Sequence, residues 1–108
     1  MIALGSDHAG LPLKKEIIAL LEEMNIPYHD YGTYTSDSCD YAMFAQRAAK
    51  AVVSGECERG ILCCGTGIGM SIAANKQRGI RAAVLSDAFS AEMTRRHNDA
   101  NVLCLGGR

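Results

Sequence analysis

Residues 59–76, RGILCCGTGIGMSIAANK, decide the fold of this chain. An apolar run ends in two adjacent cysteines, a glycine-rich turn follows, and the remainder has the composition of a helix. A strand buried on both faces of a parallel sheet has this apolar character, and a short turn into a helix makes it part of a β-α unit. We therefore predict a strand at 60–64 and a helix at 68–77.

The same alternation continues along the rest of the sequence. Its 108 residues suffice for one domain, 1–108, but not for two. Regular alternation predicts an α/β fold, a doubly wound, three-layer α/β/α Rossmann-like arrangement with a five-stranded parallel sheet. The predicted strands are 2–6, 26–31, 60–64, 81–85 and 101–105, and the predicted helices are 13–24, 40–53, 68–77 and 88–97.

The segment 13–24 has the clearest helical pattern. Pro12 suits the first turn of a helix, because that position needs no backbone N–H donor. Apolar residues recur at the spacing of one helix face, and the opposite face is polar, so we expect it to be solvated. The apolar positions are Ile17, Leu20, Leu21 and Met24, and the polar positions are Lys14, Lys15, Glu22 and Glu23.

The composition argues against several classes of partner. Eleven Lys and Arg residues stand against twelve Asp and Glu residues, which gives a formal charge of −1 and argues against nucleic acid or an acidic membrane. The first apolar run is too short for a signal peptide or a membrane span, so we expect a cytoplasmic protein. Five cysteines without a CxxC motif suggest neither a disulfide framework nor a metal site.

The glycine-rich turn predicts a site for an anion. Gly65, Thr66, Gly67 and Gly69 leave room for backbone N–H groups to converge where larger side chains would obstruct them. If the next helix begins near Ile68, the partial positive charge at its N-terminus adds to these amides. A structural strand-to-helix connection is the alternative reading of the same glycines.

The two cysteines before this turn have different expected roles. Side chains alternate along a strand, so Cys63 and Cys64 point to opposite faces. We assign Cys64 to the site, where the amides and the helix N-terminus favour its thiolate, and Cys63 to the core. The alternative for Cys64 is an ordinary buried cysteine.

Polar residues gather where the predicted strands end, and ligands of open α/β sheets bind at that edge. His97 and Asn98 instead end the fourth helix, toward the opposite edge, so a neighbouring subunit is needed to bring them to the site. The strand-end residues are Asp7, His8, Asp30, Gly32, Ser86, Asp87 and the segment 106–108.

Several of these residues also have purely structural readings. Asp7 suits the cap of the first helix or a turn. His97 suits a helix C-terminus, where the dipole stabilises an imidazolium. Arg95 and Arg96 suit a solvated helix face, although either could bind a phosphate.

A dinucleotide-binding fingerprint is a further alternative for GTGIGM at 65–70. Asp87 follows about 20 residues later at a strand end, as that fingerprint requires. However, Met70 occupies the position of the third glycine, and the turn follows the third strand instead of the first. A P-loop is absent, because no Gly-Lys-Ser/Thr follows the turn.

Helices normally cover both faces of a parallel sheet, yet no helical segment follows the fifth predicted strand. We expect the cover to come from a partner subunit or from a longer chain of which this sequence is a fragment.

Four motifs together resemble the ribose-5-phosphate isomerase B family, which is related to the galactose-6-phosphate isomerase subunits. They are GSDHAG at 5–10, DYA at 40–42, CCGTGIGMSIAANK at 63–76 and RRHNDANVLCLGGR at 95–108. The resemblance covers almost the whole chain. It implies metal-independent, cofactor-free interconversion of D-ribose 5-phosphate and D-ribulose 5-phosphate through a cis-enediolate.

The resemblance also implies roles for individual residues. Cys64 would move a proton between C2 and C1, Thr66 would relay a proton between O1 and O2, and His97 would assist opening of the sugar ring. The other implied positions are the enediolate-binding amides of Gly65, Gly67, Ile68 and Gly69, the sugar-hydroxyl ligands Asp7 and Asn98, the phosphate-site residues His8 and Arg108, and Tyr41 in the sugar pocket.

Family members form a homodimer or a dimer of dimers with the active site between subunits, so the resemblance implies such a partner here. They also continue past residue 108 with a C-terminal helix and phosphate-binding arginines, and Ala42 stands where many have proline. Two alternative functions stay open: isomerisation of galactose 6-phosphate or allose 6-phosphate, and a non-catalytic phosphosugar-binding or structural subunit.

Overall fold

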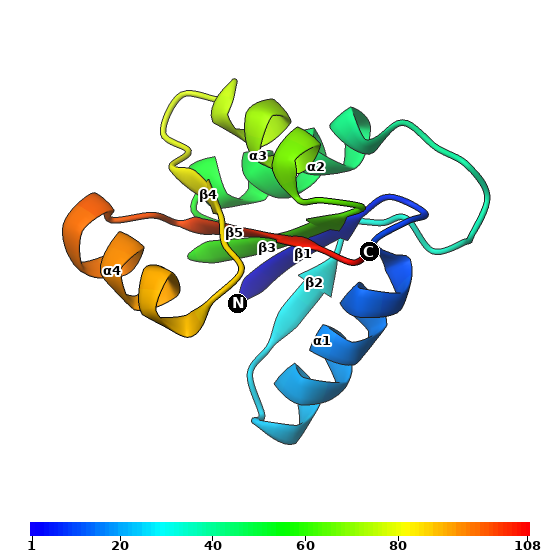
Figure 1. The fold of residues 1–108 in the computed structure, drawn as a ribbon, viewed down its shortest axis with the longest axis horizontal. Helices are drawn as coiled ribbons and strands as arrows, with labels where there is room; N and C mark the ends of the chain where they lie inside the picture. The colour runs from blue at the N-terminus through cyan, green and yellow to red at the C-terminus, as the bar shows by residue number, and fades with distance from the viewer.

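The computed structural model describes residues 1–108 as a five-stranded parallel sheet between two layers of helices (Figure 1). This confirms the predicted fold class. The elements in chain order are β1 (Ile2–Ser6), α1 (Leu11–Glu23), β2 (Tyr28–Asp30), α2 (Tyr41–Val53), β3 (Arg59–Cys64), α3 (Ile68–Asn75), β4 (Ala82–Val84), α4 (Ala88–Asn98) and β5 (Val102–Gly106).

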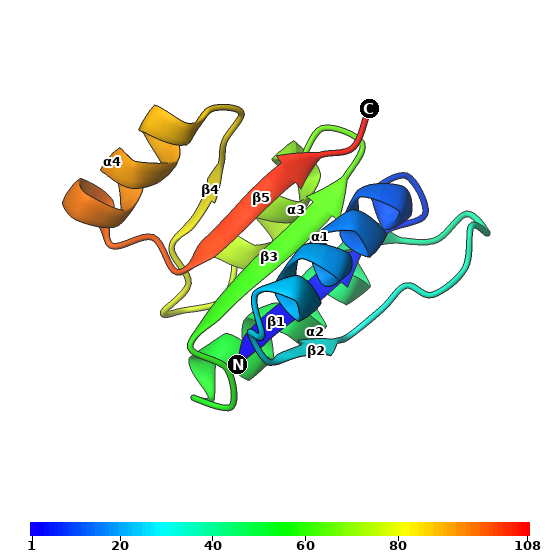
Figure 2. The same cartoon turned by 90° about the horizontal axis from the view of Figure 1, so that it is seen from below.

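The order of the strands across the sheet is β2-β1-β3-β5-β4, and all neighbouring strands are parallel. The last strand in sequence therefore lies inside the sheet, and the short β4 forms one edge. Helices α2 and α3 cover one face, while α1 and α4 lie on the other (Figures 1 and 2). Because the strands are parallel, the segments that follow them meet at one end of the sheet, beside the carboxyl ends of the strands, where a ligand site is expected.

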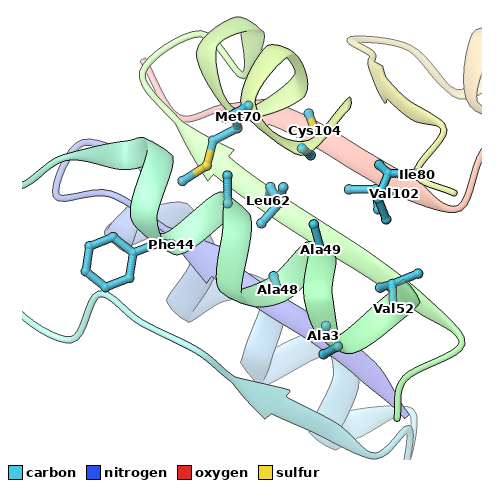
Figure 3. Packing of buried hydrophobic residues seen from close by; sticks show 14 of the residues in the cluster. Ala3, Phe44, Ala48, Ala49, Val52, Leu62, Met70, Ile80, Val102 and Cys104 are labelled. Atoms are coloured by element: carbon cyan, nitrogen blue, oxygen red, sulfur yellow. The ribbon is translucent and has the colours of Figure 1, made fainter. Parts of the chain in front are cut away.

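The main hydrophobic core lies between the sheet and the α2–α3 layer (Figure 3). Alanines at positions 45, 48 and 49 are buried in α2, so this helix approaches the sheet closely. Leu62 of β3 and Met70 of α3 fill the remaining space and are fully buried. Truncating either side chain to alanine should cost about 2–5 kcal/mol, because the surrounding backbone cannot collapse into the cavity.

The observed element ends differ from the predicted ones by up to two residues. Helix α1 starts earlier than predicted, at Leu11, because Asp7 Oδ1 accepts the Gly10 N–H at 2.9 Å and Pro12 fits the first turn. Helix α2 begins after Asp40, whose carboxylate accepts the Ala42 N–H at 3.1 Å. Strand β2 is only three residues long.

The prediction for the two faces of α1 was wrong in part. Lys14, expected on the solvated face, is only 1% exposed, whereas Leu20 and Met24 of the apolar stripe are 52% and 57% exposed. Helix α1 presents Leu11, Lys14 and Leu21 to the interior. Lys14 is tolerated there because its ammonium group donates to the Asp30 carboxylate at 2.8 Å, which compensates for lost hydration.

Part of the sheet between α1 and α4 carries no helix (Figure 2). A groove of about 220 Å³ lies there, lined by Ile61 of β3, Leu103 of β5, Ala91 of α4 and their neighbours. The groove is thus a part of this face that α1 and α4 leave uncovered. None of the four helices is long and apolar enough to cross a membrane.

Candidate active site

A pocket of about 290 Å³ opens at the edge of the sheet where the strands end. It lies beside the ends of β1 and β3 and the first turns of α2 and α3. Segments far apart in sequence therefore supply its walls, as the strand-end pattern predicts. Its lining residues are Asp7, His8, Ala9, Tyr41, Cys64, Gly65, Thr66, Gly69 and Arg108.

Cys64 lies at the base of this pocket and accepts a hydrogen bond from the glycine-rich turn. The Gly67 N–H donates to Cys64 Sγ at 3.1 Å, and Gly67 is the N-cap of α3. The sulfur therefore lies against an amide donor at the N-terminus of a helix. Cys64 is also 5% exposed and part of the hydrophobic core cluster, so only a small part of it faces the pocket.

The neighbouring cysteines have a different environment. Burial raises the pKa of Cys63 to about 12, and burial also raises the pKa of Cys104 to about 12. Neither lines the pocket, and Cys63 lies outside the α2–α3 core cluster that contains Cys64. Cys64 is therefore the one cysteine in the pocket wall, on the opposite face of β3 from Cys63.

The turn after Cys64 is tight, and two of its glycines are needed for steric reasons. Gly67 has φ +83°, and a Cβ there would lie 2.9 Å from the Leu105 backbone. A Cβ on Gly69 would lie 2.9 Å from the Tyr41 ring, so glycine lets that ring pack against the turn. Thr66 Oγ1 accepts the Ile68 N–H at 3.2 Å, which keeps the hydroxyl at the start of α3.

Asp7 and His8 follow β1 directly into the pocket. The Asp7 carboxylate is buried and accepts the Gly10 N–H, so the structural reading of Asp7 as a turn residue holds alongside its place in the pocket wall. His8 Nδ1 accepts the Cys39 N–H at 3.4 Å. Because Nδ1 is an acceptor, a neutral His8 carries its proton on Nε2, where it is a donor.

Arg108 closes the pocket on the side of β5. Its backbone N–H donates to the Gly65 carbonyl at 3.1 Å, and the Gly107 N–H donates to the Cys64 carbonyl at 2.8 Å, so the chain end runs along the glycine-rich turn. The Arg108 side chain forms no ion pair. A guanidinium without an acidic partner is a natural ligand for an anionic group.

His97 and Asn98 do not reach this pocket. Both are exposed in the last turn of α4, and the Asn98 carbonyl accepts a hydrogen bond from Arg81 Nε at 2.6 Å, next to the beginning of β4. They therefore lie toward the opposite edge of the sheet from Cys64, as the sequence predicts. Eight of the twelve proposed site residues line the pocket in one copy of the chain. Gly67 and Ile68 belong to the adjacent turn without lining the pocket, and His97 and Asn98 lie apart from it.

Comparison with known proteins decides the family. The sequence model of the Ribose/Galactose Isomerase family matches residues 2–108. The chain belongs to this family. The resemblance in the four sequence motifs is thereby confirmed.

Individual relatives of the Ribose/Galactose Isomerase family match nearly the whole chain. Ribose-5-phosphate isomerase B of Escherichia coli (strain K12) is 52% identical over 107 residues, covering 99% of this chain and 72% of the relative. The structure of ribose-5-phosphate isomerase B from Clostridium thermocellum matches with a TM-score of 0.98 at 53% identity, covering 99% of this chain and 72% of that one. For the ribose 5-phosphate isomerase from Thermotoga maritima the TM-score is 0.97 at 47% identity, covering 99% and 74%.

Membership of the Ribose/Galactose Isomerase family leaves the dinucleotide-binding reading without support. The Asp87 carboxylate accepts the Ser90 N–H at 2.7 Å and the Ser90 hydroxyl at 3.0 Å, so it serves as the N-cap of α4. These hydrogen bonds lower the pKa of Asp87, because they stabilise the charged carboxylate. Asp87 therefore has a structural role as the N-cap of α4.

Three residues near the site were missed in the sequence. Ala9 lines the pocket, the Cys39 backbone holds His8, and Lys14 is buried beneath the strand ends. Ala9 directly follows Asp7 and His8 at a strand end, so its place in the pocket wall could have been predicted from its position. No pattern identified the other two, because their partners lie 16 to 31 residues away in sequence.

Proposed function

We propose that this chain is an aldose-ketose isomerase that interconverts D-ribose 5-phosphate and D-ribulose 5-phosphate through a cis-enediolate. The observation that carries this function is the hydrogen bond from the Gly67 amide to Cys64 Sγ within a pocket that also contains Arg108 and His8. A sulfur base beside a cationic wall is suited to a small anionic substrate with an acidic C–H bond.

In the proposed reaction Cys64 acts as the base. Its thiolate removes the proton from C2 of the open-chain aldose, and the electron pair moves toward O1 to form the enediolate. The resulting thiol returns the proton at C1. Thr66 relays a proton from O2 to O1, so the ketose forms with no net gain or loss of atoms.

The glycine-rich turn stabilises the charge that develops on O1 and O2. We expect amide N–H groups of residues 65–69 to face the substrate oxygens at the N-terminus of α3, although in the unliganded turn the Gly67 N–H donates to Cys64 Sγ and the Ile68 N–H to Thr66 Oγ1. Donors that are already oriented before the reaction contribute about 3–4 kcal/mol each to stabilisation of an oxyanion. The turn thus serves both the base and the intermediate.

The remaining pocket residues bind the ends of the substrate. His8 and Arg108 bind the phosphate, because a donor at Nε2 and a free guanidinium both match its oxygens. The Asp7 carboxylate accepts a sugar hydroxyl, and the Tyr41 ring lines the wall next to Gly69.

A second copy of the chain completes the site in this proposal. Edge strand β4 links the two ends of the molecule: Val84 lies next to the glycine-rich turn, and Arg81 contacts Asn98. A two-fold axis across this edge would place His97 and Asn98 of the partner subunit near the Cys64 pocket. Exposed apolar side chains at Ile68 and Ile72 would be buried by such a contact.

An assay of sugar phosphates tests the proposed reaction. We expect turnover of ribose 5-phosphate in the presence of EDTA, and slower turnover of galactose 6-phosphate and allose 6-phosphate. Faster turnover of a six-carbon substrate would replace the proposed substrate within the same chemistry. Thermal stabilisation by ribose 5-phosphate without any product would instead indicate a non-catalytic binding subunit.

A further inference from the structure

Lys14 is the most buried charged side chain of the molecule, and the proposed reaction does not use it. Its ammonium donates to Asp30 Oδ1 at 2.8 Å and to the Thr33 carbonyl, and it lies 5.3 Å from the centroid of the Tyr34 ring. It does not line the pocket. A charge in the interior is tolerated only when fully compensated, so these contacts fix the ammonium in one place.

These contacts all hold the beginning of the loop at 32–40, which connects β2 to α2. Asp30 Oδ1 also accepts the Gly32 N–H at 2.9 Å, and the Asp30 carbonyl accepts the Tyr34 hydroxyl at 2.8 Å. The Thr33 N–H donates to the Ser6 carbonyl at 2.7 Å, next to Asp7. Lys14 thus connects α1, the end of β2 and this loop in a single cluster.

The other end of the loop carries two contacts of the pocket. The Cys39 N–H donates to His8 Nδ1 at 3.4 Å, and Cys39 Sγ lies 3.9 Å from the same nitrogen. One residue further, Asp40 caps α2, which places the Tyr41 ring against Gly69. A backbone N–H is always a donor, so the loop fixes the tautomer of neutral His8 with its proton on Nε2.

We propose that Lys14 is a positioning residue of the sugar-phosphate pocket: by holding the loop at 32–40, it fixes the Nε2–H tautomer of His8 and the position of Tyr41. The predicted effect of Lys14 on substrate binding rests on the proposed function. The predicted effect of Lys14 on the His8 tautomer can be measured whether or not the protein turns over substrate. Lys14 acts entirely through the loop, because it touches none of the residues that would contact the substrate.

The test compares Lys14→Met with Lys15→Met, the exposed neighbour on the same helix. Methionine keeps most of the volume of lysine and removes the ammonium. We expect Lys14→Met to raise KM for ribose 5-phosphate roughly tenfold, with a smaller fall in kcat, since phosphate contacts form in both the ground state and the transition state. Lys15→Met should match the unsubstituted protein.

The tautomer of His8, read from its two ¹⁵N chemical shifts in the unliganded protein, is the second measurement. We expect the Nε2–H form in the unsubstituted protein and in Lys15→Met, and a mixture of both forms in Lys14→Met. Asp30→Asn keeps an oxygen for the Gly32 N–H and replaces Lys14→Met in the test if that variant does not fold. It should likewise raise KM and give a mixture of His8 tautomers.

A lower melting temperature with unchanged KM and unchanged His8 tautomer would overturn the proposal and leave Lys14 a purely structural residue. A raised KM with an unchanged tautomer would also overturn it, because the route through His8 would be wrong. If the unsubstituted protein shows no turnover, the proposed function fails by itself. In that case the His8 tautomer is the only measurement that tests the role of Lys14.

Discussion

The Gly67 N–H donates to Cys64 Sγ across three residues of the glycine-rich turn, at 3.1 Å. This bond joins the end of β3 to the start of α3, so the same backbone geometry that begins the helix also places an N–H donor on the sulfur. The site therefore depends on the conformation of the turn as well as on the chemistry of the cysteine.

Gly67→Ala should damage both stability and activity. Its φ of +83° disfavours any residue with a Cβ, and that Cβ would lie 2.9 Å from the Leu105 backbone, so the turn must move. Gly55→Ala is the matched control, because Gly55 has φ +85° but nothing within 4 Å of a Cβ. We expect roughly 1–2 kcal/mol of destabilisation for the control and a larger loss for Gly67→Ala.

Urea unfolding and kcat measured on both variants check this prediction. Only Gly67→Ala should lose activity in its folded state. Equal effects of the two substitutions would mean that the turn has no special role.

Cys64 should be the cysteine that an alkylating reagent modifies first within the β3–β5 region. The pKa values of Cys63 and Cys104 are both raised to about 12, so these thiols are protonated at neutral pH, and only a thiolate reacts. Raising the pH toward these values should gradually make them reactive. Peptide mass spectrometry after brief treatment with iodoacetamide measures the order, and faster labelling of Cys63 would contradict the assignment.

Removing the cap of α4 should destabilise the protein in a pH-dependent way. The pKa of Asp87 is lowered from 3.8 by its hydrogen bonds to Ser90, so its contribution to stability is present above the unfolded pKa and is lost as pH falls through the folded one. Asp87→Ala should therefore lower the melting temperature at neutral pH, and the difference should shrink in acid. A difference that stays constant down to about pH 2 would mean that the charge contributes nothing.

The sequence alone was enough to predict the features that depend on residues close together along the chain. The strand, turn and helix of 59–76 lie within two residues of their predicted ends, because apolar runs and glycines act locally. The separation of Cys64 from His97 also followed from topology alone. The burial of Lys14 could not be predicted from the sequence, because its partners Asp30 and Thr33 become its neighbours only in the folded chain. For the same reason the contact between Cys39 and His8 was invisible in sequence.

A site shared between two copies predicts complementation between inactive variants. Cys64→Ala and His97→Ala should each be nearly inactive alone. When mixed and allowed to exchange subunits, half of the dimers are mixed and carry one intact site of two, so about a quarter of the activity should return. No recovery after verified exchange would place both residues in one subunit or exclude His97 from the reaction.

The most direct test of the central claim is an NMR time course of ribose 5-phosphate in D₂O with EDTA, comparing the unsubstituted protein with Cys64→Ala and with Cys63→Ala. If the thiol proton on Cys64 exchanges with D₂O before it reaches C1, transfer through an enediolate predicts ribulose 5-phosphate with deuterium at C1. We expect this product from the unsubstituted protein and from Cys63→Ala, and almost none from Cys64→Ala. Ribulose 5-phosphate formed at an undiminished rate by folded Cys64→Ala would contradict the account.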